Sequence, residues 1–406
     1  MRYLTLATAI AGISGFVVII VAAWALGDSA TMTADFTAYW GLFFVGTGIL
    51  TGFMQETTRG VAAALQSAGP AAPELGPASP GTTGTRVWRI AAIIAAVIAV
   101  LLALTTPWFI GRIIETDRTI GAILLVIGLA SYSLQAVFQG IVAGYSRWKT
   151  YAALVTLDSV SRMVLAALAW IMGWKLVAFL VVTVLGAASW AVIVAVDRSS
   201  RSAFVAARVD VTAREFARRA ATAMAAAGAN SVLIVGFPTL VKLTNPTAAT
   251  AAAVIYAVTL TRAPILVPLM QFQSALIVRF VERRGGRVLA APLGLVVGVG
   301  ILGAGVAWLI GPWLIEVVLR SEIFAISGSL LAAYVLGATC MGALTVTGAA
   351  VLAGERHGAY LAGWLVAAVV AVVILAAVPL PLGPNAAVAL VVGPLVGFGV
   401  HMAALR

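Results

Sequence analysis

Residues 151–174 read YAALVTLDSVSRMVLAALAWIMGW. About 20 mostly apolar residues are enough for one helix to cross the hydrocarbon core of a bilayer. This stretch has that length, yet it carries an acid, Asp158, and a base, Arg162, four residues apart. It therefore predicts a membrane-spanning helix, and it raises the question of what two opposite charges do inside it.

The composition of the whole chain agrees with a membrane protein. Of its 406 residues, 62% are hydrophobic and 10% are charged, and the mean hydropathy is +1.09. Soluble domains carry about 25% charged residues, so a chain this apolar needs lipid around it. The formal net charge is +11, but basic runs interleaved with aromatic residues are missing, which argues against a nucleic-acid partner.

Three kinds of chemistry find no support in the sequence. A single cysteine, Cys340, excludes a disulfide within the chain. The two histidines, His357 and His401, stand without a His/Cys cluster, so we expect no metal site and no cofactor. There is also no Walker A sequence, so the chain carries no ATP-driven motor of its own. We expect no enzyme activity.

Apolar runs of bilayer length recur along the chain and predict an all-α, multi-pass membrane protein with twelve transmembrane helices. The first run is longer than the apolar part of a signal peptide and is followed by many others, so we interpret it as a retained helix. The expected spans are approximately 4–26, 36–58, 88–110, 119–144, 150–172, 174–196, 218–241, 248–278, 288–311, 323–353, 358–380 and 384–405.

The basic residues predict the orientation of these helices. Placing the N-terminus inside puts 18 Lys and Arg in inner segments and 5 in outer loops, and the remaining 2 of the 25 lie within spans. An excess of Lys and Arg marks the cytoplasmic side. Both termini are therefore expected to be cytoplasmic, in a bacterial cytoplasmic membrane. The five outer residues are Arg112, Arg118, Lys175, Lys242 and Arg320.

Two short motifs recur at nearly one offset. ILTGFMQ at 49–55 resembles ILVPLMQ at 265–271, and AGYSRWKTY at 143–151 resembles AGERHGAY at 353–360. Each pair occupies equivalent places among the expected spans. Internal symmetry of this kind is common in transporters, and here it predicts two six-helix lobes around a central cleft.

This symmetry defines the expected domains. Residues 1–196 form the N-terminal lobe, 197–217 a cytoplasmic linker between the lobes, and 218–406 the C-terminal lobe. The loop at about 66–87 is rich in Pro, Gly and Ala and is expected to be disordered. The basic, partly amphipathic linker is expected to rest on the inner leaflet as a surface helix.

Several scattered residues carry a family resemblance. Gly52 and Arg59 form a G-x6-R pattern, an AG-x2-R pattern ends at Arg147, and the sequences VSRMVL and TRAPILVP each hold an internal arginine. With the topology, this pattern resembles the polysaccharide (O-antigen type) flippase branch of the multidrug/oligosaccharidyl-lipid/polysaccharide exporter superfamily. The resemblance implies a V-shaped twelve-helix transporter that moves a lipid-linked glycan across the membrane by alternating access.

The charges within spans are the candidate site residues, because ionisable groups in a bilayer are costly. At ~1.5 Å per residue, Asp158 and Arg162 lie about 12 and 18 Å into their span, on one helix face that suits an ion pair. One interpretation is a salt bridge that only hides both charges. The other places them on the cleft wall, where Arg162 binds a phosphate and Asp158 positions it or takes up a coupling H⁺ or Na⁺.

Arg262 has no carboxylate within a helical turn and lies near mid-depth, followed at once by Pro264 and Pro268. Its planar guanidinium suits phosphate oxygens, and the prolines are expected to kink the helix. We therefore predict that Arg262 contacts an anionic substrate headgroup. The alternatives are pairing with Asp158 or with backbone carbonyls.

The remaining candidates are polar groups of two other spans. Arg59 is a further substrate contact and Glu56 a charge-balancing acid, although snorkelling to the headgroups explains both. Gln135 and Gln139 share a face with Tyr132 and predict a wet interior, unless they only bond neighbouring helices.

The predicted function is that of a flippase for a lipid-linked oligosaccharide or polysaccharide precursor. Its partners would be membrane lipid, the lipid-linked glycan, and a polysaccharide polymerase or glycosyltransferases. A drug or metabolite exporter of the same superfamily and a non-transporting scaffold of an envelope-synthesis complex are alternatives. A polytopic lipid-sugar glycosyltransferase is a further one, with Asp28 and Asp35 as its acids in the first outer loop.

Overall fold

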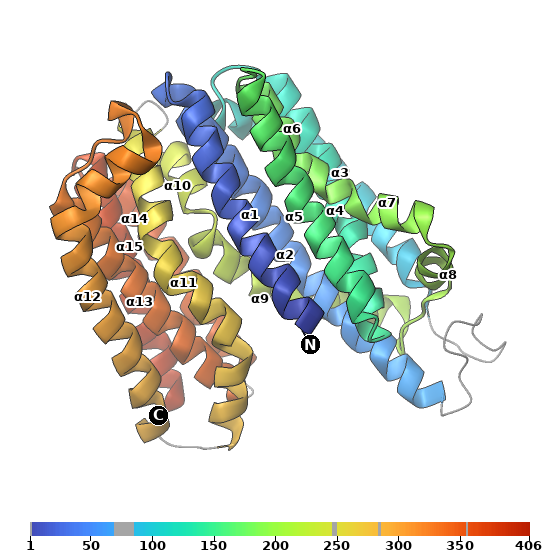
Figure 1. Ribbon diagram of the computed structural model, residues 1–406. Helices are drawn as coiled ribbons and strands as arrows, with labels where there is room; N and C mark the ends of the chain where they lie inside the picture. Colours follow the sequence, from blue (N-terminus) through green and yellow to red (C-terminus); the bar gives the residue numbers. More distant parts are fainter. Residues whose placement is uncertain (1, 69–84, 246–249, 283–285, 355) are drawn as a thin grey trace. The chain divides into compact units, whose positions relative to one another are not determined.

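The structure is a computed structural model, and it describes all residues except 1, 69–84, 246–249, 283–285 and 355 (Figure 1). The described residues are almost entirely helical and include no β-sheet. Ten of their helices are long and apolar enough to cross a membrane, and a bent pair of helices raises this number to eleven. The protein is therefore an all-helical, multi-pass membrane protein.

The chain divides into two compact units, and each is described by itself. Unit 1 comprises Met1–Ala25 and Leu42–Ser231. The helix α2 (Ala30–Ala68) contributes only its second part to this unit. The other helices that lie in unit 1 wholly or for most of their length are α1 (Arg2–Leu26), α3 (Val87–Ile113), α4 (Arg118–Gly144), α5 (Trp148–Ile171), α6 (Leu176–Leu185), η1 (Gly186–Ala188), α7 (Ser189–Val196), α8 (Arg198–Ala206) and α9 (Ala213–Ile234).

Unit 2 comprises Leu26–Gly41 and Val232–Arg406, so it includes the first part of α2. Its central helix is α13, which packs against α11, α12 and α15 and is the most buried of the apolar spans (Figure 1). The helices of unit 2 are α10 (Phe237–Thr244), α11 (Ala251–Glu282), α12 (Gly286–Leu319), η2 (Glu322–Phe324), α13 (Gly328–Ala353), α14 (His357–Ala377) and α15 (Leu382–Leu405).

These units differ from the domain boundaries that we expected at residues 196 and 218. The segment 26–41 groups with the second unit, and residues 197–231 group with the first. The number of spans and the cytoplasmic location of the termini stay predictions. The expected span at 248–278 corresponds to α11, which continues as one helix through Pro264 and Pro268 and whose described apolar part is Ala251–Leu266.

Two expected spans are interrupted along their length. The span at 174–196 consists of α6 and α7 joined by the 3-10 turn η1. The span at 218–241 consists of α9 and α10, whose axes differ by 70°. A break in a helix releases backbone carbonyls from the i+4 pattern, and inside a membrane these groups need other donors. Polar side chains near the breaks are therefore the expected donors to these carbonyls.

The turns that join α4 to α5 and α13 to α14 show the same backbone hydrogen bonds 209 residues apart. Arg147 N donates to Val142 O at 2.7 Å, and Arg356 N donates to Val351 O at 3.1 Å. The bond from Tyr151 N to Arg147 O likewise corresponds to the bond from Tyr360 N to Arg356 O, both at 3.1 Å. The two turns thus share one local backbone structure, in which Arg147 corresponds to Arg356 and Tyr151 to Tyr360.

The expected linker 197–217 contains a short amphipathic helix, α8, followed by an extended segment. Phe204 of α8 is buried against Phe138 and Trp190. The extended segment bonds to the start of α3, because Val87 N donates to Ala207 O and Val209 N donates to Thr85 O, both at 3.2 Å. The linker is therefore part of unit 1. Most of the expected disordered loop at 66–87 lies outside the described residues.

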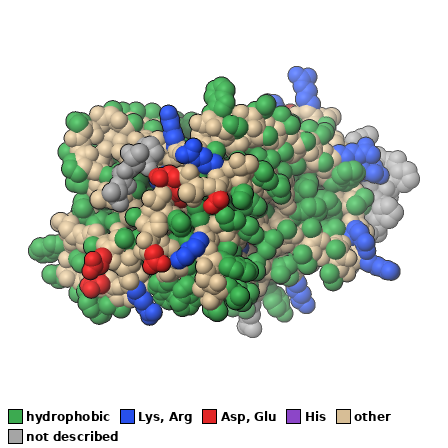
Figure 2. Space-filling model, turned by 90° about the horizontal axis from the view of Figure 1, so that it is seen from above, with side chains coloured by type: hydrophobic (Ala, Val, Ile, Leu, Met, Phe, Trp, Pro, Cys, Tyr) green, Lys and Arg blue, Asp and Glu red, His purple; other side chains and the backbone are tan. Residues whose placement is uncertain are grey.

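Apolar side chains face outward along the spans, as contact with lipid requires. Figure 2 views the molecule from above Figure 1, onto the ends of many helices, and shows hydrophobic groups with scattered charged ones there. On α3, Ile93, Val97 and Leu104 are 63%, 50% and 66% exposed. A soluble protein rarely exposes contiguous apolar surface on this scale, so this helix is suited to a lipid environment.

Candidate functional site

Asp158 and Arg162 form an ion pair on α5 inside unit 1. Arg162 Nη1 lies 2.7 Å from Asp158 Oδ2, and the arginine side chain is only 5% exposed. The guanidinium carbon also lies 5.2 Å from the ring centre of Phe44 and 5.8 Å from that of Phe43. The i,i+4 spacing predicted this pair, and both charges are held within protein.

The same arginine also bonds to the broken span. Arg162 Nε donates to the carbonyl of Thr183 at 3.1 Å, just before the turn η1. Ser131 of α4 donates to Ala187 O at 2.7 Å. With its amide oriented to donate, Gln135 lies 3.2 Å from Gly186 O and 3.3 Å from Ala187 O. Side chains of α4 and α5 thus bond to carbonyls at the break.

Gly186 is required at this position because the pair packs directly on it. A Cβ at Gly186 would overlap Asp158 Oδ1 and the guanidinium of Arg162. The turn, the glycine and the ion pair therefore form one unit, which we name the α6 break cluster: Ser131, Gln135, Asp158, Arg162 and Gly186. Gln139 is buried one turn further along α4, and among the described residues no hydrogen bond joins it to this cluster.

Arg262 of α11 occupies a different environment in unit 2. It is 8% exposed, and its Nη1 donates to the carbonyl of Leu233 at 3.4 Å, close to the bend between α9 and α10. Within the part of the chain that the structure describes, this is its single hydrogen bond and no carboxylate pairs with it. The expected backbone-carbonyl contact is present.

A second buried ion pair lies in unit 2, and the sequence did not predict it. Lys242 Nζ of α10 is 2.9 Å from Asp35 Oδ1 of α2, and the two side chains are 3% and 1% exposed. Thr239 of α10 also donates to Ala38 O at 2.7 Å. The placement of Asp35 and Lys242 in outer loops was wrong, because both belong to helices and are buried. Each residue directly adjoins an expected span, 36–58 for Asp35 and 218–241 for Lys242. That adjacency was the available sign that the helices continue to include them.

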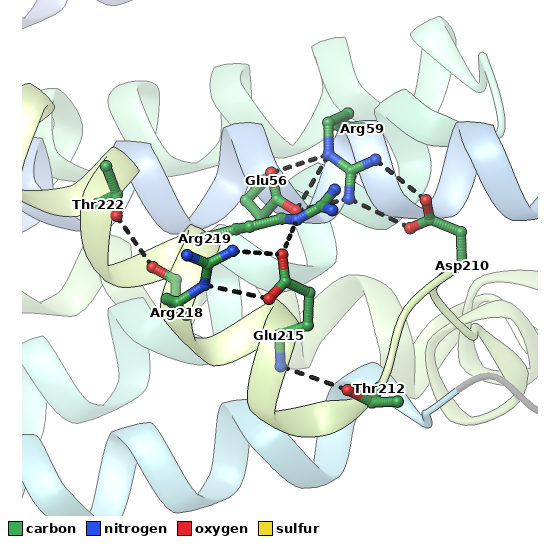
Figure 3. A network of polar contacts seen from close by, with 8 residues as sticks. All are labelled: Glu56, Arg59, Asp210, Thr212, Glu215, Arg218, Arg219 and Thr222. Atoms are coloured by element: carbon green, nitrogen blue, oxygen red, sulfur yellow. Dashed lines mark hydrogen bonds and ion pairs between the residues drawn. The ribbon is translucent and has the colours of Figure 1, made fainter.

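Arg59 and Glu56 form part of a network at the other end of α2 (Figure 3). Arg59 Nη2 lies 2.6 Å from Glu56 Oε1, and Arg59 Nη1 lies 3.1 Å from Asp210 Oδ2 of the linker segment. Arg218 and Arg219 of α9 both pair with Glu215, at 2.9 and 2.7 Å. The G-x6-R arginine therefore ties α2 to the segment before α9.

The other motif residues have local structural contacts. A Cβ at Gly52 would overlap the backbone of Ala223 in α9, so this glycine permits close packing of two helices. Arg147 Nη2 donates to Ser199 Oγ at 2.7 Å and lies 3.3 Å from Asp197 Oδ2. Asp197 in turn caps α8 and accepts hydrogen bonds from Ser199 and Ser200, which lower the pKa of its carboxyl.

The structure thus separates the predicted site residues into three groups. Arg162, Asp158 and Gln135 lie together at the α6 break, Arg59 and Glu56 lie in the network at the end of α2, and Arg262 lies in unit 2. No group of three or more His, Cys, Asp or Glu side chains suited to a metal ion occurs among the described residues.

The fold is that of known membrane transporters. The structure matches an inward-facing multidrug resistance MATE family transporter of the MOP superfamily with a TM-score of 0.71 and 15% identity, covering 97% of this chain and 94% of that one. It matches the lipid II flippase MurJ in an inward-closed conformation with a TM-score of 0.65 and 13% identity, covering 100% and 87%. The chain is therefore a multi-pass membrane protein with the MATE and MurJ fold.

Sequence relatives place the chain more narrowly, although no protein-family model matches it. It is 39% identical over 404 residues to the uncharacterized protein Mb3654 of Mycobacterium bovis, covering 98% of this chain and 90% of the relative. It is 38% identical over 373 residues to the uncharacterized protein Rv1510 of Mycobacterium tuberculosis, covering 91% and 83%. The chain belongs to the family of these mycobacterial proteins.

Proposed function

We propose that this protein is a transporter that moves a lipid-linked oligosaccharide or polysaccharide precursor across the bacterial cytoplasmic membrane. It would work by alternating access between two six-helix lobes, and it would not be an enzyme. One observation carries the proposal: Arg262 is a buried cation with a single 3.4 Å hydrogen bond to a carbonyl and no carboxylate partner among the described residues.

The electrostatic argument concerns the sign of the unbalanced charge. A buried ion is unfavourable unless it is paired, and an arginine offers a planar set of donors that matches phosphate oxygens. The phosphate or pyrophosphate of a lipid-linked glycan is an anion of this kind. Arg262 is thus a group that such a substrate would neutralise.

The buried and partly buried acids point in the same direction. Asp35 pairs with Lys242, Glu56 with Arg59, and Asp158 with Arg162. A transporter for organic cations would benefit from an unbalanced acid, but these three carboxylates already have basic partners. The unbalanced charge at Arg262 favours an anionic substrate.

The contacts in unit 1 favour a structural role for the other predicted site residues. Arg162, Asp158 and Gln135 hold the α6 break together, and the carboxylate of Asp158 already balances the charge of Arg162. Arg59 and Glu56 connect α2 to the linker segment. We therefore propose Arg262 as the main phosphate contact and a supporting role for the others.

The fold of the neighbours is compatible with two substrate classes. MurJ is a lipid II flippase, which supports a lipid-linked substrate, whereas the MATE transporters support export of small molecules. A MATE structure has a TM-score of 0.71, higher than that of MurJ. A small-molecule exporter is therefore our second candidate function, after the flippase that Arg262 favours. Its substrate would be anionic for the reason given above.

The test is flipping of a fluorescent lipid-linked oligosaccharide in proteoliposomes that contain the full chain. We expect Arg262→Ala to reduce the initial rate by about tenfold or more, because hydrogen bonds to charged groups contribute about 1.5–3 kcal/mol. Arg262→Lys keeps the charge and should retain part of the rate. Arg118→Ala removes an exposed arginine and should leave the rate unchanged.

Two outcomes would contradict the proposal in different ways. An undiminished rate in Arg262→Ala would remove this residue from the substrate site. A wild-type protein that flips none of several lipid-linked glycans, but exports a small anion, would establish the second candidate. If it transports neither, the scaffold role becomes the better account.

A further inference from the structure

Unit 1 contains an apolar recess that the proposed function does not use. It has a volume of about 270 Å³ and lies among α2, α3, α4 and α9. Its lining consists entirely of apolar side chains and one glycine, among them Val45, Ile49, Ile98, Leu129 and Met224. A recess of this composition can bind hydrocarbon, and it offers no group to a sugar.

The recess reaches the exposed apolar surface of α3. Leu101 both lines the recess and is 55% exposed. The neighbouring residues Val97 and Leu104 are exposed and apolar as well. A hydrocarbon chain from the surrounding bilayer can therefore enter the recess without passing a polar group.

Arginines gather where α2 ends and where α3, α9 and the extended segment before α9 begin. We name these residues the arginine layer: Arg59, Arg86, Arg89, Arg208, Arg214, Arg218 and Arg219. The bonds between the start of α3 and the linker segment bring Arg86 and Arg208 opposite one another in an isolated β-bridge. Figure 3 shows Arg59, Arg218 and Arg219 gathered in one network.

The arginine layer has an excess of positive charge. The same segments contain three acids, Glu56, Asp210 and Glu215, so seven arginines minus three carboxylates leave a net charge of +4. The side chain of Arg218 is 76% exposed and that of Arg219 is 41% exposed. Both can approach an anion at the membrane surface while they remain paired with Glu215.

The spacing between the two features suits one lipid molecule. Met224 follows Arg219 by five positions, and Ile98 follows Arg89 by nine. At ~1.5 Å per residue these intervals are about 8 and 14 Å, within one half of a hydrocarbon core of about 30 Å. A phosphate at the arginine layer would thus place its hydrocarbon chain at the recess.

We propose that the arginine layer and the apolar recess together bind one anionic phospholipid, as a resident lipid and not as cargo. The exposed arginines supply charge for a small phosphate headgroup, and the purely apolar recess takes one of its chains. Nothing in this site recognises a glycan. The inference therefore does not depend on the proposed function.

The test compares phosphatidylglycerol with phosphatidylcholine of identical acyl chains, bound to the purified full chain and detected by native mass spectrometry. We expect phosphatidylglycerol to bind more tightly. The double variant R218Q/R219Q should weaken its binding by about tenfold or more, since each basic residue near an anionic lipid contributes about 1 kcal/mol. Ile98→Phe, which fills the recess, should weaken it as well.

Matched controls isolate the site. R198Q/R201Q removes two exposed arginines of α8 outside the arginine layer, and Val100→Phe enlarges an exposed residue of α3 that does not line the recess. Both should bind phosphatidylglycerol like the wild type. Equal binding of the two lipids, or equal losses in site and control variants, would overturn the proposal.

A measurement on the wild type keeps the proposal testable if a variant does not fold. Phosphatidylglycerol with a photoreactive group in its acyl chain should label peptides that contain residues 42–50 and 98–102, which line the recess. Labelling confined to other helices would contradict the assignment of the chain to this recess.

Discussion

Arg162 in unit 1 and Arg262 in unit 2 are buried arginines that donate to backbone carbonyls near breaks in spans. Arg162 bonds to Thr183 O at 3.1 Å and pairs with a carboxylate at 2.7 Å. Arg262 bonds to Leu233 O at 3.4 Å and has no acid partner among the described residues. One environment neutralises its cation, and the other leaves the charge unbalanced.

This difference separates a structural arginine from one available to a ligand. The presence of an arginine inside a span does not by itself reveal its role, because every buried charge is unfavourable without a partner. The number and distance of the partners are more informative. The predictions below test whether the two arginines differ in their contribution to stability, as their contacts imply.

The largest effect is expected from Asp158→Asn. It leaves the buried Arg162 without a carboxylate, and breaking a buried ion pair from one side costs about 3–5 kcal/mol. The free energy of unfolding in detergent micelles measures this loss. The double variant Asp158→Leu/Arg162→Met should recover much of it, and a single variant as stable as the wild type would show that the pair is not coupled to folding.

The second effect concerns the glycine beneath the pair. Gly186→Ala places a methyl group against Asp158 and Arg162 and forces them or the α6 break to move. Overpacking of this kind costs about 1–3 kcal/mol. Thermal unfolding of the purified variant should show the loss, and Gly305→Ala, where a Cβ meets open space, is the control. Equal stability of both variants would mean that the break adapts freely.

A smaller loss is expected for Gln135→Leu. The substitution removes the amide that lies near Gly186 O and Ala187 O, and a buried carbonyl that loses its donor costs about 1–3 kcal/mol. The carbonyl of Ala187 keeps its bond from Ser131, so we expect the lower end of this range. Gln139→Leu is the control on the same helix. A larger loss in the control would indicate that Gln135 does not support the break.

The smallest change in stability is expected for Arg262→Met. The variant removes a charge that has one long hydrogen bond, and replacing a poorly compensated buried ion with an apolar side chain is often neutral or stabilising. We expect a change below about 1 kcal/mol in unfolding free energy, together with the loss of flipping described above. A destabilisation as large as that of Asp158→Asn would give Arg262 a structural role.

Much of the fold could be predicted from residues 151–174 and from runs like them. The length of the apolar runs predicted a helical membrane protein, because lipid requires every backbone group to be satisfied within the segment. The i,i+4 spacing of Asp158 and Arg162 predicted their ion pair, because helical geometry brings such residues together. The recurring motifs predicted two six-helix lobes, which stays a prediction, although the turns at both motifs share backbone hydrogen bonds.

Other features depend on contacts between distant parts of the chain. Asp35 and Lys242 are 207 residues apart, and Arg59 and Asp210 are 151 apart. Periodicity within one helix carries no information about such pairs. The break at Gly186–Ala188 contains no proline, and the side chains that bond to its carbonyls come from α4 and α5.

The sequence by itself therefore determined two things: the helices are long enough to cross a bilayer, and the charges inside them need partners. Which partner each charge finds depends on how the helices pack, because the competing donors and acceptors belong to other segments. Packing gives Arg162 a carboxylate and a carbonyl, and gives Arg262 a carbonyl alone. The local sequence already placed an acid one turn from Arg162 and none near Arg262. The tertiary structure decided that no described carboxylate from a distant segment reaches Arg262, and this is the reason that it remains the candidate for substrate binding.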